Sequence, residues 1–390
     1  MCNKNDILNS SMRCEKHLES DLLKEEITMD TNKLNRILKS MEEQGLPQMI
    51  ISDPPTIYYL TGKWIHPGER LLALYLNVNG NHKLVINKLF PQEKDLGVEL
   101  VWYDDIEDAV EILSKFVEKD KPIGIDKVWP ARFLLRLQEL GAGSKFLNGS
   151  LIVDYVRQIK DEKEQQLMRE AGAANDKIVE KLIPYVVKGY TELEMEKIVR
   201  DMYAETGHSG VSFDPIIGYG KSGADPHHVN TEMKGKIGDS VILDIGGILN
   251  DYCSDLTRTV FIGEVSDRAR EVYEVVKEAQ RRGIEAAKPG NRMCDVDLAC
   301  RNYITEKGFG EYFTHRTGHS IGMEDHEYGD VSSVNTDIIK PGQCFSIEPG
   351  IYLMDEGIGV RIEDIVLITE DGCETLNNYT KDLIVVPVEE

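Results

Sequence analysis

Five residues in the second half of the chain have the side chains and local settings of metal ligands. Four are carboxylates and one is an imidazole: Asp244, Asp255, His319, Glu348 and Glu363. An oxygen-rich set with a single histidine suits hard or borderline divalent ions such as Mn²⁺ better than an ion that prefers thiolates. Two adjacent ions can generate a bound hydroxide and stabilise both ends of a displacement at a carbonyl group. The pattern therefore indicates hydrolytic metal chemistry.

The four carboxylates occur as two pairs, and each pair flanks a segment that can form a hairpin. Asp244 ends a run of β-forming residues, and Asp255 lies eleven residues later, beyond a predicted turn at 249–251. Glu348 and Glu363 lie fifteen residues apart. Taken singly, these residues also fit a capping aspartate or an exposed strand glutamate. A hairpin would bring each pair to one place, and paired buried carboxylates repel each other unless a cation lies between them.

Three histidines have settings that suit a hydrolytic site. His319 lies between Gly318 and Gly322, where glycines allow a close approach of backbone and metal. His326 follows seven residues later, and His227 occurs in the segment Asp225-Pro226-His227-His228. Such residues can carry protons or donate hydrogen bonds to an oxyanion. The sequence assigns no role to the other histidines considered, which are His66, His82, His208 and His315.

The elements around these residues suggest two domains. Residues 1–28 form a polar leader, 29–155 a small N-terminal α/β domain, and 156–390 the domain that carries the candidate site. Strands are predicted in the first domain at five places, 48–52, 56–60, 71–78, 82–87 and 123–126, with a hairpin turn at Asn79-Gly80.

Two helix pairs, each followed by strands, organise the second domain. The charged stretch 157–164 is the predicted hinge and the opening of the first helix, which runs to about Val187 with Pro184 as a bend or early end. Thr191 with Glu194 forms a capping box for the next helix. The second pair is predicted at 267–287 and 295–307. The repeated order suggests an internal pseudo-repeat.

Composition excludes several functional classes. The chain has 390 residues and a net charge of −23, which disfavours binding to a phosphate backbone, so no nucleic-acid partner is expected. Neither a membrane-spanning apolar run nor a signal peptide is expected. The seven cysteines form no CxxC pair, which suits free thiols in a reducing compartment, and we expect a cytoplasmic protein.

These motifs, in this order and spacing, resemble the pita-bread metallopeptidases that act on Xaa-Pro bonds, the prolidase and aminopeptidase P group. Residues 57–62 resemble part of the creatinase-type N-terminal domain of that group. The resemblance implies an α/β (α+β) fold, with a small creatinase-type domain before a pseudo-symmetric pita-bread domain whose curved antiparallel sheet holds the site. It also implies two divalent ions, Mn²⁺ or Co²⁺ with Zn²⁺ possible, bound by the five residues named first. Asp255 and Glu363 would each bridge both ions.

The resemblance implies further roles. Of His227 and His326, one would bind the scissile carbonyl oxygen or the proline end, and the other would help to stabilise the tetrahedral intermediate. The nucleophile would be a hydroxide that bridges the ions. Glu348 would take the proton that the bridging water loses and pass it to the leaving imino nitrogen. Arg361 would lie near substrate and metal, and Tyr352 is a weaker hydrogen-bonding candidate. Two departures from the family pattern, His228 and Ser320 at positions where glycine is more usual, affect the expected pocket shape.

The expected activity is therefore that of an Xaa-Pro dipeptidase, acting on small peptides with proline at the second position. Xaa-Pro aminopeptidase activity is the main alternative. Methionine aminopeptidase, a creatinase-type hydrolase and a non-catalytic binding module of the same fold are weaker alternatives. The N-terminal domain argues against the first of these, and the intact ligand set argues against the other two. The resemblance also implies a homodimer.

Overall fold

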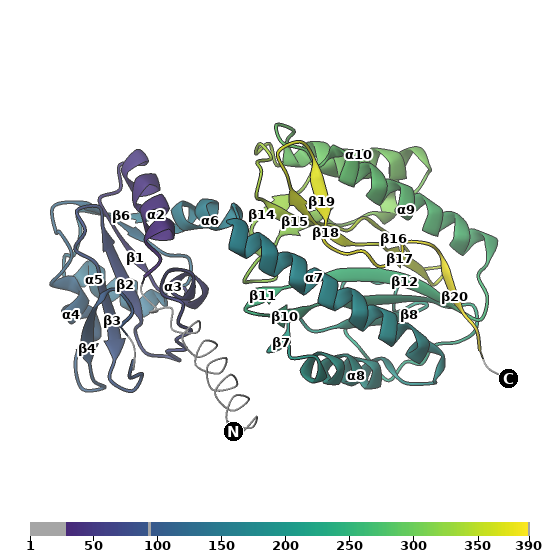
Figure 1. Cartoon of the computed structure of the whole chain (residues 1–390), viewed down its shortest axis with the longest axis horizontal. Helices are drawn as coiled ribbons and strands as arrows, with labels where there is room; N and C mark the ends of the chain where they lie inside the picture. The colour runs from purple at the N-terminus through teal and green to yellow at the C-terminus, as the bar shows by residue number, and fades with distance from the viewer. Residues whose placement is uncertain (1–28, 93–94, 389–390) are drawn as a thin grey trace, which may run out of the picture. The chain divides into compact units, whose positions relative to one another are not determined.

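The computed structural model describes residues 29–92 and 95–388, and Figure 1 shows the whole chain. The chain divides into two compact units, Met1–Val156 and Arg157–Glu390. Both units combine helices with mixed or antiparallel sheets, which confirms the predicted α/β fold class. The predicted leader, 1–28, lies outside the described residues. No helix in the described ranges is long and apolar enough to cross a membrane.

The first unit is built around one six-stranded sheet with the order β4-β3-β2-β1-β5-β6. Its elements in chain order are α2 (Thr31–Glu43), β1 (Gln48–Ile51), α3 (Pro54–Thr61), β2 (Ala73–Asn77), β3 (Lys83–Asn87), β4 (Glu99–Tyr103), α4 (Ala109–Ser114), β5 (Pro122–Ile125), α5 (Ala131–Glu139), β6 (Lys145–Asn148) and α6 (Ser150–Gln158). The hairpin predicted at Asn79-Gly80 is confirmed, because β2 pairs antiparallel with β3 and Gly80 has a φ of 88°.

The strand predicted at 56–60 is wrong, because this segment belongs to helix α3. The Asp53 side chain accepts a hydrogen bond from the Thr56 backbone N–H at 3.1 Å and caps the helix. Pro54 and Pro55 fix φ in the first turn, where the missing N–H groups cost no helical hydrogen bond. Gly62 ends the helix in the left-handed conformation, with a φ of 65°.

The second unit contains four long helices and most of the strands. Its elements in chain order are α7 (Glu162–Leu182), the 3₁₀ helix η1 (Ile183–Val187), α8 (Glu192–Glu205), β7 (Gly210–Val211), β8 (Ile216–Tyr219), β9 (Ser240–Ile245), β10 (Gly247–Leu249), β11 (Tyr252–Cys253), β12 (Leu256–Ile262), α9 (Asp267–Ala286), α10 (Met293–Glu306), the 3₁₀ helix η2 (Gly310–Tyr312), β13 (Gly318–Ser320), β14 (Glu327–Val331), β15 (Cys344–Ile347), β16 (Gly350–Leu353), β17 (Ile358–Arg361), β18 (Asp364–Ile368), β19 (Cys373–Thr375) and β20 (Ile384–Val386). The regular part of the first helix ends before Pro184, and the capping box predicted at Thr191 and Glu194 is present.

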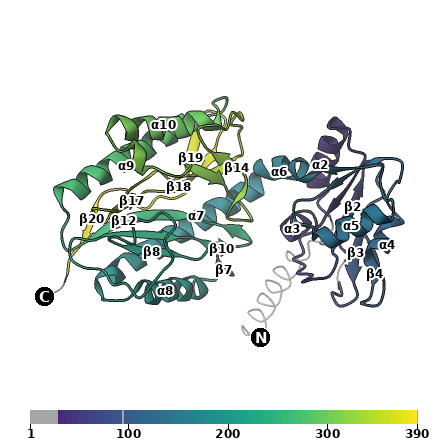
Figure 2. The same ribbon diagram turned by 180° about the vertical axis from the view of Figure 1, so that it is seen from behind.

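Two apolar cores divide the second unit into halves. Helices α7 and α8 contribute Ile178, Met195 and Val199 to a core shared with β8, β9 and β12. Helices α9 and α10 bury Val276 and Val296 in another core, against β15, β17 and β18. Figures 1 and 2 show the strands of this unit between α9 and α10 on one side and α8 on the other. The helix pairs therefore fix two sets of strands, and the candidate site lies where the sets meet.

Candidate active site

Strands β9 and β12 bring the two aspartates together. They pair antiparallel, with Asp244 opposite Thr257, and Asp255 directly precedes β12. The connecting hairpin turns through Asn250 and Asp251, whose φ values of 50° and 66° suit these residue types. This confirms the predicted hairpin. Both aspartates are buried, and the Oδ1 atom of each has no hydrogen-bond partner among the described residues.

Strands β15 to β18 bring the two glutamates to the same place. Glu348 follows β15, Glu363 precedes β18, and these strands pair with Ile347 opposite Asp364. The intervening segment forms the hairpin β16–β17, as predicted. Thr257 Oγ1 donates a hydrogen bond of 2.6 Å to Glu363 Oε2, and so joins this carboxylate to strand β12.

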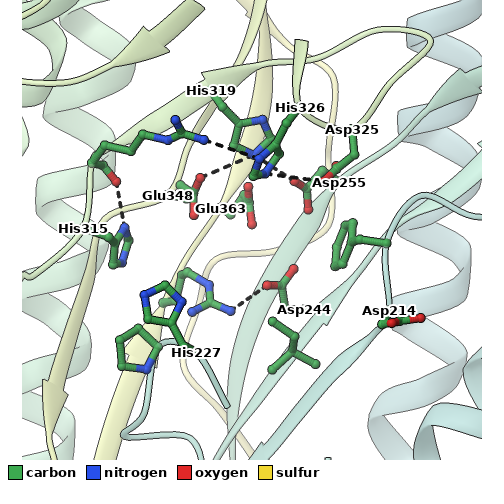
Figure 3. A pocket seen from close by; sticks show the side chains of 15 residues that line it. Asp214, His227, Asp244, Asp255, His315, His319, Asp325, His326, Glu348 and Glu363 are labelled. Atoms are coloured by element: carbon green, nitrogen blue, oxygen red, sulfur yellow. Dashed lines mark hydrogen bonds and ion pairs between the residues drawn. The ribbon is translucent and has the colours of Figure 1, made fainter. Parts of the chain in front are cut away.

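His319, on β13, completes the cluster. Its Nε2 atom lies 3.5 Å from Asp255 Oδ2 and 3.5 Å from Glu348 Oε1. The candidate ligand atoms of Asp255, His319 and Glu363 all lie within 4.8 Å of one another. Figure 3 shows all five residues proposed from the sequence facing one pocket. This cavity of about 460 Å³ is large enough for a small peptide.

The electrostatics of the cluster fit divalent cations. Burial, and then the charge of neighbouring carboxylates, raises the pKa of both Asp255 and Glu363 well above the usual range. Burial followed by the charge of His326 lowers the pKa of His319 to about 3, so its imidazole is neutral and keeps a lone pair. Glu363 Oε1, like the two aspartate Oδ1 atoms, is buried without a hydrogen-bond partner within the described part of the chain. Cations would neutralise these carboxylates and occupy their unpartnered oxygens.

The remaining histidines predicted for the site line the pocket wall. The ring of His326 lies over that of His319, with 3.8 Å between centroids. His227 is exposed and lines the same pocket from the loop after β8. This loop packs closely on β17, because a Cβ atom added at Gly359 would lie 1.8 Å from the backbone oxygen of Gly223.

His228, which departs from the family pattern, anchors this loop. Its Nε2 atom lies 2.7 Å from Oε2 of Glu192, a fully buried side chain at the start of α8. The adjacent His227 lines the pocket. The structure therefore places the two consecutive histidines in different surroundings, one at the cavity and one against the helix.

Arg361 is buried on β17, and its guanidinium group already has protein partners. Its Nη2 atom donates to Asp244 Oδ2 at 2.6 Å, its Nη1 atom to the Tyr352 hydroxyl at 2.8 Å, and its Nε atom to Thr257 Oγ1 at 3.1 Å. The hydrogen bond from Arg361 fixes the orientation of the Asp244 carboxylate. The side chain therefore positions a candidate ligand, although Arg361 also lines the pocket.

His315 lines the pocket too, although the sequence assigned it no role. Its Nδ1 atom lies 2.7 Å from the Arg316 carbonyl oxygen and must carry the proton there, so Nε2 accepts from the Tyr352 hydroxyl at 2.9 Å. Burial, and then the charge of Arg361, lowers the pKa of His315 to about 4 and keeps it neutral. Its position four residues before His319 was the available sequence signal.

Asp325 is a further carboxylate of the pocket that the sequence did not reveal. Its Oδ1 atom is buried without a partner among the described residues, and its Oδ2 atom lies 3.4 Å from His326 Nε2. Burial, and then the charge of Asp244, raises the pKa of Asp325 to about 7. The only sequence signal was its place next to His326.

Comparisons with known proteins agree with this geometry. Residues 166–370 match Metallopeptidase family M24, and residues 33–159 match the Creatinase/Prolidase N-terminal domain. An uncharacterized peptidase of Staphylococcus aureus strain USA300 is 36% identical over 352 residues, which are 90% of this chain and 99% of that protein. A prolidase from Thermococcus sibiricus superposes with a TM-score of 0.86 at 33% identity, covering 92% of this chain and 99% of that one. A dipeptidase from Pyrococcus horikoshii OT3 gives 0.85 at 33% identity, with 90% and 99% covered.

Proposed function

Because this chain belongs to metallopeptidase family M24, we propose that it is the metallopeptidase that its site suggests, an Xaa-Pro dipeptidase. The observation that carries the proposal is the convergence of the five buried or half-buried candidate ligands on one cavity of about 460 Å³. The likeness to a prolidase and a dipeptidase supports this substrate class. The substrate would be a small peptide with proline at its second position.

We propose that Asp244, Asp255, His319, Glu348 and Glu363 would hold two divalent ions. The oxygen-rich donor set favours Mn²⁺, and Co²⁺ and Zn²⁺ are compatible. When bound, such ions polarise a carbonyl group and lower the pKa of a water molecule enough for it to attack at neutral pH.

Glu348 would carry the proton in this reaction. Without ions in the site, burial raises its pKa to about 8, with the charge of Arg361 acting in the opposite direction, and bound cations would lower the pKa again. A carboxylate beside the attacking water can accept the proton that the water loses and pass it to the leaving group. Its Oε1 atom accepts a hydrogen bond of 3.1 Å from Ser346 Oγ, which orients the group. The proton would go to the proline nitrogen, which has no hydrogen of its own and must be protonated to leave.

The pocket histidines would bind the peptide. His227 and His326 are exposed side chains that line the cavity. An N–H group of either ring can donate to the scissile carbonyl oxygen as negative charge develops on that oxygen. Arg361 would act indirectly by holding Asp244. His315 and Tyr352 would fix that arginine from the other side.

Hydrolysis of Ala-Pro compared with Ala-Pro-Ala, measured with added Mn²⁺, tests the proposal. We expect cleavage of Ala-Pro by the wild-type protein and loss of that activity in Glu348→Gln. Cleavage of the tripeptide alone would identify an Xaa-Pro aminopeptidase instead. Absence of bound metal and of activity after addition of Mn²⁺ would favour a non-catalytic binding module.

We also propose that the catalytic domain covers residues 156–390 and that the protein acts as a cytoplasmic homodimer. Four buried free cysteines, Cys253, Cys294, Cys300 and Cys344, are compatible with a reducing compartment. Light scattering of the purified protein measures the oligomeric state, and a monomer would contradict the proposal.

A further inference from the structure

Two arginines line the cavity, and only one has its guanidinium group fully engaged. All three guanidinium nitrogens of Arg361 donate to protein oxygens, on Asp244, Tyr352 and Thr257. Arg316 is exposed, and its one side-chain hydrogen bond among the described residues is long, with 3.4 Å between its Nη2 atom and Nδ1 of His326. It forms no ion pair with any residue that the structure describes. A ligand in the cavity therefore meets free N–H groups at Arg316 and not at Arg361.

The backbone that carries Arg316 is held firmly. Arg301, on α10, donates from Nη1 to the Phe313 carbonyl oxygen at 3.0 Å and from Nη2 to the His315 carbonyl oxygen at 2.8 Å. Thr317 Oγ1 donates to Oδ1 of the fully buried Asp297 at 2.8 Å. The residues on both sides of Arg316 are thus fixed from α10. The backbone of Arg316 is therefore held in place, while its guanidinium group remains available to a ligand.

The charges around the cavity make this arginine unusual. Besides Arg316 and Arg361, the charged side chains of the lining are carboxylates, and bound cations would neutralise the candidate ligands among them. A substrate carboxylate would therefore find its free positive partner at Arg316. It would be attracted by a guanidinium group, whose planar fork can bind both carboxylate oxygens at once. His315 and His326, which also line the cavity, can donate only as the tautomer allows.

We propose that Arg316 is a specificity-determining residue that binds a carboxylate group of the peptide substrate. The proposal rests on the Xaa-Pro peptidase function and deepens it. The carboxylate has two chemical sources, the free C-terminus of a dipeptide and an acidic side chain at the residue before proline. The first source would make the protein a dipeptidase, and the second would give it a preference for acidic first residues.

Four peptides separate these sources in steady-state kinetics with added Mn²⁺. Ala-Pro and Ala-Pro-amide differ only in the C-terminal carboxylate, and Asp-Pro-amide and Asn-Pro-amide differ only in the side-chain carboxylate. We expect the wild-type protein to prefer the carboxylate member of one pair by about 10-fold in kcat/KM, as a lost charge-assisted contact at a partly solvated site would give. Arg316→Gln should remove that preference, chiefly through KM.

Two further variants control for charge and for geometry. Arg270→Gln removes the same charge from an exposed position on α9 outside the cavity and should keep the preference. Arg316→Lys keeps the positive charge but lacks the planar pair of N–H donors, so it should keep part of the preference that Arg316→Gln loses. The proposal would be overturned if Arg316→Gln preferred the carboxylate peptide of each pair as strongly as the wild-type protein does. It would also be overturned if the wild-type protein showed no preference in either pair.

A binding measurement separates this proposal from the proposed function. Titration calorimetry of Ala-Pro, Ala-Pro-amide, Asp-Pro-amide and Asn-Pro-amide uses the Glu348→Gln protein in excess Mn²⁺, with and without Arg316→Gln, after elemental analysis has shown that both proteins hold the same amount of metal. About 10-fold weaker binding of one carboxylate peptide, with its neutral partner unaffected, supports the role of Arg316 even if no peptide is cleaved. Unchanged dissociation constants contradict that role, whereas failure of the wild-type protein to cleave any of the four contradicts the Xaa-Pro peptidase function.

Discussion

The two halves of the second unit contribute to the site in the same way but hold each other's ligands. The half built on β9 and β12 supplies Asp244 and Asp255, and the half built on β15 to β18 supplies Glu348 and Glu363. Each pair comes from one hairpin region.

The supporting contacts cross between the halves. Arg361 of the second half holds Asp244, and Thr257 of the first half donates to Glu363. The Glu363 backbone N–H also donates to the Thr257 carbonyl oxygen at 3.1 Å. The comparison teaches that one ligand of each half, Asp244 and Glu363, is oriented by the other half, so the site depends on the seam between them.

The largest expected effect comes from breaking the buried ion pair at this seam. Arg258 Nη2, on β12, donates to Asp364 Oδ1, on β18, at 2.7 Å, and both side chains are almost fully buried. Arg258→Met should lower the free energy of unfolding by about 3 kcal/mol, because it leaves a buried carboxylate with weaker compensation. Urea denaturation measures this. Arg268→Met, which breaks a half-exposed pair with Glu356, should cost less than about 1 kcal/mol.

The next largest effect should follow the loss of one proposed metal ligand. Asp255→Asn should lower metal content and reduce kcat/KM on Ala-Pro by at least about 100-fold, because residues that only support ligands already cost 10- to 100-fold. Elemental analysis and the peptidase assay check this. Asp251→Asn makes the same change in the adjoining hairpin turn and should leave both values unaffected. Retention of metal and activity by Asp255→Asn would remove this residue from the ligand set.

A smaller effect is expected when a ligand stays but loses its support from the other half. Arg361→Lys should weaken Mn²⁺ binding by about 10- to 100-fold, since lysine cannot contact Asp244, Tyr352 and Thr257 together. Calorimetric Mn²⁺ titration measures the affinity. An unchanged affinity would show that Asp244 holds its position without the second half.

The smallest expected effect depends on pH. Glu327 lies at the start of β14. It accepts hydrogen bonds from two residues that precede α7, from Arg157 Nη2 at 2.7 Å and from Lys160 Nζ at 2.8 Å. Burial alone would raise the pKa of Glu327, but the charges of Lys160 and Arg157 outweigh it and lower the pKa to about 2.

Because the folded-state pKa is depressed, this carboxylate stabilises the fold above its unfolded pKa, and the contribution is lost as pH falls towards 2. We expect the free energy of unfolding to fall by on the order of 1–2 kcal/mol between pH 5 and pH 3 from this group. Urea denaturation at both values measures the fall. Glu327→Gln should show a smaller pH dependence, and an identical dependence would refute the assignment.

Local chemistry explains what could be predicted from the sequence. The hairpin carboxylates follow β-forming runs, and the turn at Asn250 and Asp251 needs residues that tolerate positive φ. Capping side chains at Thr191 and Glu194 define the start of α8. Each of these signals lies within a few residues of the feature that it predicts.

The helix at Pro54–Thr61 also has local signals, because Asp53 caps it and two prolines fix its first turn, and these outweigh the strand preference of the aromatic and β-branched residues at 56–60. Features that depend on distant contacts could not be predicted in this way. Asp325 reaches the pocket through the pairing of β13 with β14, which shifts register between His319 and Ser320. Nothing in the neighbouring residues indicates that shift.

The close approach of Gly359 to Gly223 fixes the loop that brings His227 to the cavity. An alanine at position 359 would have no space beside that backbone oxygen, so the 223–227 segment would have to move away from β17. His227 would move with this segment. A single hydrogen atom in place of a methyl group thus lets a strand of one half hold a loop of the other.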